Sequence, residues 1–543
     1  MPIAYATVYN RTQGKGTITD LDGYFRLNHV QGWDTLVISF IGFHQMEFKD
    51  PLDANGKTLY MDPRTEQLRE VVVTANNDYL YKFLADAKKT QSNSIRTAKT
   101  YFSLATHTDE KQIEVVEGYY NGSYRGYDLQ KLDMKNGRIA LAEFNNRFFV
   151  STGSSRVLQL HELFGTNEHF PFSPLEFSKG KMKKRFDLAL VSEYVDESDR
   201  KIMVIDYEPY EENKALFKGR MWIDANTKQI QKVTLRVEDA KVYPFAPIWS
   251  NDALQRVDMN ITKDFTELDG AMFMNSVTLN YTMQYKMRGG PVQNITSDAV
   301  LFAYDHQEAF ELPFFEFTND IHADLRNINA APYNAFFWEN IDEFTSSDRV
   351  EKNAYFIGQE STIDDRTLFS NNKYFEKGEF ERPYVRWSEK RIRLREDIPD
   401  SVDYKEVAGA LPSERYNLNV KIYLDVNTYN DSTDVLTSTI FDPYNTFFHY
   451  PSNKAGMAFI NMYFDLMEIK RRELVDDIDA SSRSLKEVRR LYDAKMEEAE
   501  ETGRAFFKDV QHGTDPEGMM RWNKLIEKEL QVNNVELFRL YSD

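Results

Sequence analysis

The stretch "FMNSVTLNYTMQY", residues 273–285, alternates large apolar and small polar side chains and decides the fold of the middle of the chain. Four apolar residues share one side of this alternation, and Ser, Thr, Asn and Gln occupy the other; the four are Val277, Leu279, Tyr281 and Met283. Successive side chains of a β-strand point to opposite faces. The stretch therefore predicts a long strand with one buried face.

Hairpin patterns precede this strand. Residues 217–223 and 230–237 flank a turn at 224–227, and residues 257–261 lead towards the strand through Leu268-Asp269-Gly270. Together they predict an antiparallel curved sheet or half barrel over residues 100–310. A membrane-spanning barrel needs strands of about 9–11 residues with one continuously apolar face, and only the stretch above meets this requirement well. The half barrel is favoured, and an outer-membrane β-barrel is the weaker alternative.

Composition bounds the classes of function. The chain has 543 residues, more than one compact core usually holds, so several domains are expected. Its 67 Lys and Arg against 86 Asp and Glu give a net charge of -19, and an acidic surface repels phosphate backbones. Nucleic acid is therefore not a predicted partner. The absence of cysteine excludes disulfides, thiolate metal sites and cysteine nucleophiles.

Patterns that look like chemical sites fail on their spacing. His161-Glu162 would need a second histidine one helical turn later to bind zinc, and position 165 is glycine. Sequences that begin as calcium loops do, at Asp20 and Asp425, lack the closing glutamate. The sequence therefore predicts no catalytic, cofactor-binding or metal-binding residues and no cofactor. A hydrolase whose site is assembled from distant residues stays an alternative.

The first 75 residues predict a small β-sandwich of short strands. Three of its motifs resemble the carboxypeptidase-like regulatory domain at the front of many Bacteroidota envelope proteins, including TonB-dependent receptors. They are "PIAYATVYNRTQGKGTITDLDGYFRL" (2–27), "DTLVISFIGF" (34–43) and "LREVVVTA" (68–75). The resemblance implies a transthyretin-like, non-catalytic domain and a location in the cell envelope.

A second resemblance concerns the middle of the chain. The runs "GRMWIDANTKQIQKVTL" (219–235) and "FTELDGAMFMNSVTLNY" (265–281) are similar to lipoprotein-carrier (Lol-type) half barrels, in which a curved antiparallel sheet wraps a helix. Receptor function does not follow from the first resemblance, because the chain ends in helical patterns where a receptor barrel would end in a strand.

The rest of the chain completes a mainly β, multidomain α+β organisation. A linker helix is predicted over residues 76–99, an aromatic-rich irregular region over 311–415, and a strand followed by amphipathic helices over 416–543. Candidate partner contacts are a basic run and two tryptophans: Lys181, Lys183, Lys184, Arg185, Trp338 and Trp387. The alternatives are a solvated hairpin for the basic run and buried aromatic anchors for the tryptophans.

These patterns predict a non-enzymatic cell-envelope protein that binds or scaffolds outer-membrane or periplasmic proteins, with lipid or membrane-surface contact as an additional feature. The alternative is a carrier that holds an apolar ligand or lipid against Val277, Leu279, Tyr281 and Met283. A carrier leaves that face lining a cavity, whereas a scaffold fills it with its own side chains.

A first prediction concerns the start of the chain. The regulatory domain family usually begins with one more strand upstream of Pro2, so we expect that strand and the signal peptide before it to be absent from this chain. A sandwich without an edge strand exposes unpaired backbone groups. A chain extended upstream is therefore expected to melt at a higher temperature and to aggregate less. Equal melting temperatures and equal monodispersity of the two proteins would contradict this expectation.

Overall fold

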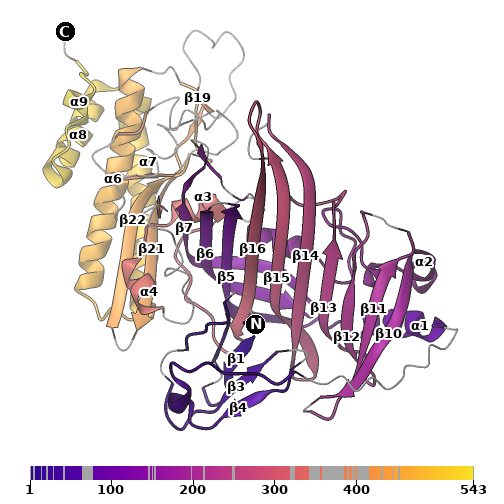
Figure 1. Ribbon diagram of the computed structural model, residues 1–543. Helices are drawn as coiled ribbons and strands as arrows, with labels where there is room; N and C mark the ends of the chain where they lie inside the picture. Colours follow the sequence, from indigo (N-terminus) through magenta and orange to yellow (C-terminus); the bar gives the residue numbers. More distant parts are fainter. Residues whose placement is uncertain are drawn as a thin grey trace. The chain divides into compact units, whose positions relative to one another are not determined.

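The computed structural model describes two compact units of the chain (Figure 1). One unit comprises residues 1–310, 318–328 and 338–361, and the other comprises 311–317, 329–337 and 362–543. The described residues are 2–3, 6–13, 15–19, 22–27, 30–40, 43–63, 77–109, 111–144, 147–149, 151, 154–196, 198–211, 214–247, 251–317, 324–341, 355–356, 384–387, 391–393, 398, 400–401, 415–429, 432–443, 445–450 and 453–541.

The N-terminal domain contains a four-stranded antiparallel sheet in the order β2-β1-β3-β4. The strands are β1 (Thr7–Asn10), β2 (Lys15–Ile18), β3 (Leu36–Ser39) and β4 (Met46–Phe48). Val8 lies opposite Ile38 in this sheet, and both side chains are buried. We expected strands at 24–27 and 59–61, but these two segments join no sheet in the described part of the chain. Tyr24 and Tyr60 are 75% and 81% exposed, so burial of these side chains does not hold the segments against a sheet. The expected strand at 70–74 lies outside the described residues.

The predicted strand at 273–285 lies within β15, in an antiparallel sheet of 11 strands. In sheet order the strands are β10 (Phe186–Val195), β11 (Lys201–Pro209), β12 (Lys218–Asp224), β13 (Ile230–Val237), β14 (Ala253–Leu268), β15 (Ala271–Lys286), β16 (Val292–Asp305), β5 (Ile95–Thr108), β6 (Gln112–Arg125), β7 (Asp128–Leu141) and β17 (Tyr355–Phe356). Figure 1 shows the long strands β14, β15 and β16 side by side.

Two features of the chain set the order of this sheet. The turn between β14 and β15 is Asp269-Gly270, with φ of 52° and 78°, which is the left-handed geometry that tight hairpins prefer. On the far side of β15, strand β16 pairs with β5, which comes from the start of the same domain; Leu301 lies opposite Phe102. The sheet thus joins its last long hairpin strand to its first strand.

Short elements complete this part of the chain. They are α1 (Asp78–Ala87), a 3-10 turn (Lys88–Thr90), β8 (Glu143–Phe144), β9 (Arg147–Phe148), 3-10 turns at Arg156–Leu160 and Pro174–Glu176, α2 (Lys179–Arg185), α3 (Asp324–Ala330) and α4 (Ala335–Asn340). The linker helix predicted over 76–99 is shorter in the structure, because α1 ends at Ala87 and β5 begins at Ile95; Leu80, Tyr81 and Leu84 of α1 are buried. The Tyr81 hydroxyl donates a hydrogen bond to the carbonyl of Phe186, 2.9 Å away, which ties the helix to β10.

The second unit combines small sheets with helices. One sheet has the order β18 (Val385–Arg386), β22 (Ser432–Phe441), β21 (Val420–Tyr429), and the other has β19 (Asp400–Ser401), β23 (Phe447–Phe448), β20 (Tyr416–Asn417). The helices are α6 (Lys454–Asp479), α7 (Leu485–Val510), α8 (Pro516–Leu530) and α9 (Asn534–Leu537). The apolar stripe predicted over 459–496 spans α6 and α7, and the chain breaks between them at Arg483, where φ is 51°.

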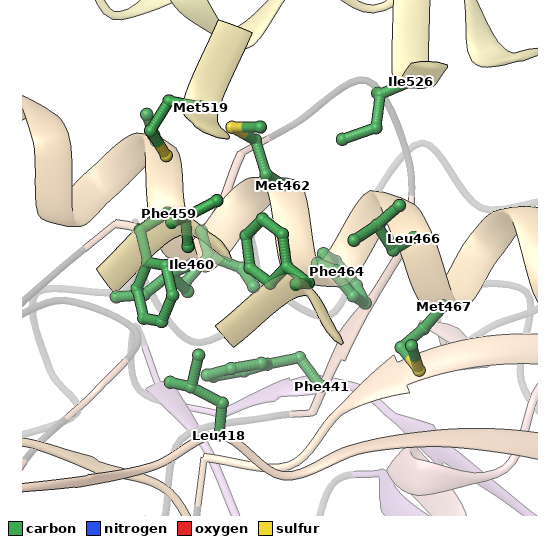
Figure 2. Packing of buried hydrophobic residues seen from close by; sticks show 14 of the residues in the cluster. Leu418, Phe441, Phe459, Ile460, Met462, Phe464, Leu466, Met467, Met519 and Ile526 are labelled. Atoms are coloured by element: carbon green, nitrogen blue, oxygen red, sulfur yellow. The ribbon is translucent and has the colours of Figure 1, made fainter. Parts of the chain in front are cut away.

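Aromatic side chains from α6 and α7 dominate the core of the second unit. Figure 2 shows Phe459 and Phe464 of α6 near Leu418 and Phe441, with Met519 and Ile526 of α8 in the same cluster. The rings of Phe459 and Phe506 stack with centroids 5.5 Å apart. Asp515 caps α8 by accepting a hydrogen bond from the Gly518 amide at 2.6 Å. Within the described part of the chain, no helix is long and apolar enough to cross a membrane.

A second prediction follows from the packing of β12. A Cβ atom at Gly219 would lie 1.9 Å from the carbonyl oxygen of Thr234 and 2.7 Å from the Tyr207 hydroxyl. Gly219→Ala is therefore expected to lower the free energy of unfolding by about 2–3 kcal/mol, because the strands must move apart. Urea denaturation measures this loss.

Gly180 provides the matched control. It lies in helix α2 with no atom within 4 Å of its Cβ position, so Gly180→Ala is expected to change stability by at most about 1 kcal/mol, in the stabilising direction. Similar midpoints for the two variants would show that β12 is not packed as described.

Candidate binding face of the large sheet

The four residues predicted to form an apolar ligand face lie together on one side of β15. In the register with β14, Ile261 lies opposite Leu279, Met259 opposite Tyr281 and Val257 opposite Met283. We call these seven residues the inner face: Val257, Met259, Ile261, Val277, Leu279, Tyr281 and Met283. Their side chains are 1–4% exposed, so the inner face is continuous and buried.

Residues outside the strands lie against the inner face at Tyr281. We call residues 149, 151 and 154–177 the covering segment. The ring of Phe149 meets that of Tyr285 at a centroid distance of 5.9 Å, and the Ser151 hydroxyl lies 3.3 Å from the hydroxyl of Tyr281. Phe245 adds a ring 4.2 Å from that of Tyr281. Side chains of the protein itself therefore fill the space next to Tyr281.

A lysine interrupts the apolar surface. Lys263 of β14 lies between Val233 and Val277 in the register and is 1% exposed. Its ammonium group donates a hydrogen bond to the carbonyl of His161 in the covering segment, 2.5 Å away. Burial lowers the pKa of Lys263, while the negative charges of nearby carboxylates, Asp128, Glu162 and Glu176, act in the opposite direction. The cation thus binds the backbone of the covering segment directly.

The histidine beside this lysine is not a metal ligand in the arrangement seen here. The His161 ring is 3% exposed and meets the edge of Phe170 at 5.4 Å. Burial holds the pKa of His161 well below its usual value, so the ring is neutral. Among the residues that the structure describes, no three His, Asp or Glu side chains are grouped to hold a metal ion.

Three buried carboxylates bind amides of the covering segment. Asp128 accepts from the Leu163 amide at 2.7 Å, and Glu114 accepts from the Ser151 amide at 2.7 Å. Asp324 accepts from the Ser155 amide at 2.6 Å and from the Ser155 hydroxyl at 2.7 Å. Hydrogen bonds to an ionised acceptor are stronger than neutral ones. The covering segment is therefore fastened by buried acidic side chains at several points along its length.

Glu114 has a perturbed titration. Burial raises the pKa of Glu114 to about 7, although hydrogen bonds from Ser151 and Thr106 favour its charged form, and the charge of Asp324 raises it further. The Thr106 hydroxyl lies 3.0 Å from the Glu114 carboxylate and 2.9 Å from the Ser297 hydroxyl. Glu114 therefore changes its protonation near neutral pH within a network that also holds the covering segment.

The basic run forms helix α2 and not the hairpin that we kept as an alternative. Lys and Arg favour helices, and three basic residues in the last turn interact well with the helix dipole. The side chains of Lys181, Lys183, Lys184 and Arg185 are exposed. Lys183 pairs with Asp78, and the Arg185 guanidinium lies 4.9 Å from the Phe177 ring. Lys181 and Lys184 form no ion pair with the described residues.

Trp338 lies inside the first unit, in agreement with the alternative of a buried anchor. It is 7% exposed, and its Nε1 donates to Asn136 at 3.2 Å. The Arg138 guanidinium lies 4.1 Å from the indole ring, and the Tyr119 ring meets it at 5.7 Å. These contacts use the whole ring for internal packing.

Trp387 belongs to the second unit and is half-buried. Its Nε1 donates to the Asp465 carboxylate at 2.7 Å, and Arg391 donates to the same oxygen at 2.7 Å. Asn534 donates to the other carboxylate oxygen, also at 2.7 Å. Asp465 is fully buried on α6, so Trp387 helps to pair a buried charge. The predicted contact residues are therefore not brought together in one site.

Sequence reasoning missed the charged residues that fasten the covering segment. Lys263 has a visible signal, since it occupies an inward position in the alternation of Val257, Met259, Ile261 and Phe265. Glu114 and Asp128 have no such signal, because their partners lie 35 or more residues away.

Comparison with known proteins confirms the first resemblance. Residues 1–73 match the family model of the CarboxypepD_reg-like domain. No curated protein matches the chain.

Among solved structures, the chain is similar to a LolA superfamily protein from Nitrosomonas europaea, with 10% identity over 42% of this chain and 94% of that chain and a TM-score of 0.16. It is also similar to the MucA/MucB complex of Pseudomonas aeruginosa, with 12% identity over 41% and 92% of the two chains and a TM-score of 0.14. At these TM-scores, the argument for function rests on the residues of this chain.

A third prediction uses the titration of Glu114. The ordinary pKa of the carboxyl is 4.5, and the folded state raises it to about 7. Between these pH values the folded state binds more protons than the unfolded state, so this contribution to stability is present below pH 4.5 and is lost as pH rises through 7. A shift of this size amounts to roughly 3 kcal/mol. Glu114→Gln removes this dependence.

Urea unfolding at pH values from 4 to 8 measures how the contribution of Glu114 to stability depends on pH. The free energy of unfolding of Glu114→Gln minus that of the wild-type protein is expected to rise by roughly 3 kcal/mol through the window and then to level off. Glu176, whose pKa burial also raises to about 7, is present in both proteins and cancels. Glu208→Gln, at an exposed position of β11, is expected to follow the wild-type protein. A flat difference for Glu114→Gln would contradict the buried network.

Proposed function

We propose that this chain is a non-enzymatic cell-envelope protein that binds or scaffolds other proteins in an outer-membrane-associated assembly. The observation that carries the proposal is the closed inner face. Its apolar side chains are 1–4% exposed, and the covering segment is fastened above them by buried charges. A face closed in this way supports a rigid platform.

The fastening makes the closed state costly to open. Removing the His161 carbonyl from Lys263, or the Leu163 amide from Asp128, leaves a buried charge without its partner. Such losses cost several kcal/mol each where the group stays buried. The large sheet and the covering segment therefore act as one body, whose outer surface is available for contact with partners.

The chain offers a specific contact surface on α2. Lys181 and Lys184 present cations on a protein whose net charge is -19. Most of this acidic chain repels an acidic partner surface, whereas the exposed lysine pair attracts one. The lysine pair therefore favours an acidic partner. The CarboxypepD_reg-like match at residues 1–73 supports placement of this assembly in the envelope, on the periplasmic or outer-membrane side.

A catalytic role has little support. Glu114 and Ser151 form a carboxylate and hydroxyl pair with a 2.6 Å hydrogen bond, but Glu114 is 1% exposed beneath the covering segment. A nucleophile and its base must be reachable by a substrate. The pair instead holds two parts of the backbone together.

A carrier for an apolar ligand or lipid is the second candidate, and the composition of the inner face favours it. Its aliphatic and aromatic side chains follow one another on β15 from Val277 to Met283, opposite Ile261, Met259 and Val257 of β14. The covering segment crosses this face outside the sheet's own strands and is held there by polar groups. Displacement of the segment would expose an apolar surface of the kind that lines ligand pockets.

A fourth prediction tests the proposed function. Because the chain has no cysteine, Lys184→Cys introduces a unique position for a photo-cross-linker on α2. Irradiation of envelopes is expected to give a discrete adduct with an envelope protein. Lys241→Cys, at an exposed lysine outside α2, is the matched control and is expected to give none.

Lipid extraction of the same purified protein separates the two candidates. Adducts from position 184 without stoichiometric lipid support the scaffold. Stoichiometric lipid without adducts supports the carrier. A protein that carries no lipid and forms no adducts contradicts both.

A further inference from the structure

The second unit contains a pocket that the proposed function does not use. Its volume is about 530 Å³, within the range of ligand sites. Aromatic rings form much of its lining, together with Lys508 and the first turn of α6. The ring-bearing residues that line it are Phe448, Tyr450, Phe507 and His512.

A strained turn holds one wall of this pocket in place. Gln511, His512 and Gly513 follow one another with φ of 44°, 64° and 89°, all in the left-handed region. Such a conformation costs about 1–3 kcal/mol for each non-glycine residue and collects at ligand sites. Gly513 cannot carry a side chain, since its Cβ would lie 2.9 Å from the carbonyl oxygen of Ala455 in α6.

The turn orients the imidazole of His512 among other rings. Its centroid lies 4.9 Å from that of Tyr450 and 5.0 Å from that of Tyr416. Phe507 packs against Tyr416 at 5.6 Å. Tyr450, Phe507 and His512 thus line the pocket as one cluster of rings, and aromatic rings pair best in offset or edge-on arrangements.

Charge narrows the class of ligand. Of the described residues that line the pocket, Lys508 bears the formal charge and none is a carboxylate. Lys508 is exposed and forms no ion pair with the described part of the chain. One lysine suits one negative charge, whereas phosphate groups are usually held by several donors or by arginine.

We propose that this pocket binds an aromatic ring that carries a carboxylate. The ring enters among Tyr450, Phe507 and His512, and the carboxylate pairs with Lys508. This chemistry is supplied by the C-terminal aromatic residue of a peptide or by a free aromatic acid. The pocket belongs to the unit without the inner face, so the test below does not depend on the proposed function.

A fifth prediction tests this binding with the full chain. Isothermal titration calorimetry with N-acetyl-L-phenylalanine is expected to give a dissociation constant below about 1 mM. The neutral N-acetyl-L-phenylalaninamide is expected to bind about tenfold more weakly, because it lacks the charge that pairs with Lys508.

Lys508→Met removes the charge and keeps most of the side chain. It is expected to weaken binding of the acid about tenfold and to leave binding of the amide unchanged. Lys524→Met, at an exposed lysine of α8 that does not line the pocket, is the matched control and is expected to change neither. Circular dichroism checks that both variants are folded.

Titration with a short peptide that ends in phenylalanine distinguishes the two sources of the ligand. Tighter binding than that of N-acetyl-L-phenylalanine supports the proposal with a chain end as the source, and equal binding supports it with a free acid. No measurable binding of the acid, or equal affinities of the wild-type protein and Lys508→Met for it, would overturn the proposal.

Discussion

The burial of an irregular segment over an apolar face is the constraint on which the first unit depends. The covering segment has only short 3-10 turns, so much of its backbone cannot pair within itself. Apart from the Tyr281 hydroxyl, the side chains of the inner face cannot accept or donate strong hydrogen bonds. Charged residues placed among them, chiefly Asp128, Glu114 and Lys263, pair these backbone groups instead. The ionisable groups inside the first unit therefore have a structural role, and no catalytic role is needed to explain their presence.

The scaffold and the carrier differ in the free energy needed to displace the covering segment, not in the shape of the first unit. A scaffold needs the covering segment to stay paired, and the charge-assisted bonds provide this. A carrier needs the ligand to supply enough apolar contact to offset the loss of those bonds. The aromatic pocket of the second unit needs no such displacement, because a strained turn packed against α6 holds its wall in place.

Much of the fold could be predicted from residue patterns that act locally. The alternation at 273–285 and the Asp-Gly turn at 269–270 each work within a few residues, and the structure has both. The site could be predicted only in its apolar half, because the partners of Glu114 and Asp324 lie far away in sequence. Helix α2 was not predicted, since its short basic run was expected to form a solvated hairpin and the burial of Met182 is not visible in the sequence.

The pairing of β16 with β5 has a consequence for how the first unit forms. Leu301 and Phe102 are neighbours in the sheet although nearly two hundred residues separate them in the chain. Loops of that length close slowly, and a topology dominated by distant contacts folds slowly. A nascent chain cannot pair β16 with β5 until residue 305 has emerged, so the strands β5, β6 and β7 join the rest of the large sheet late in synthesis.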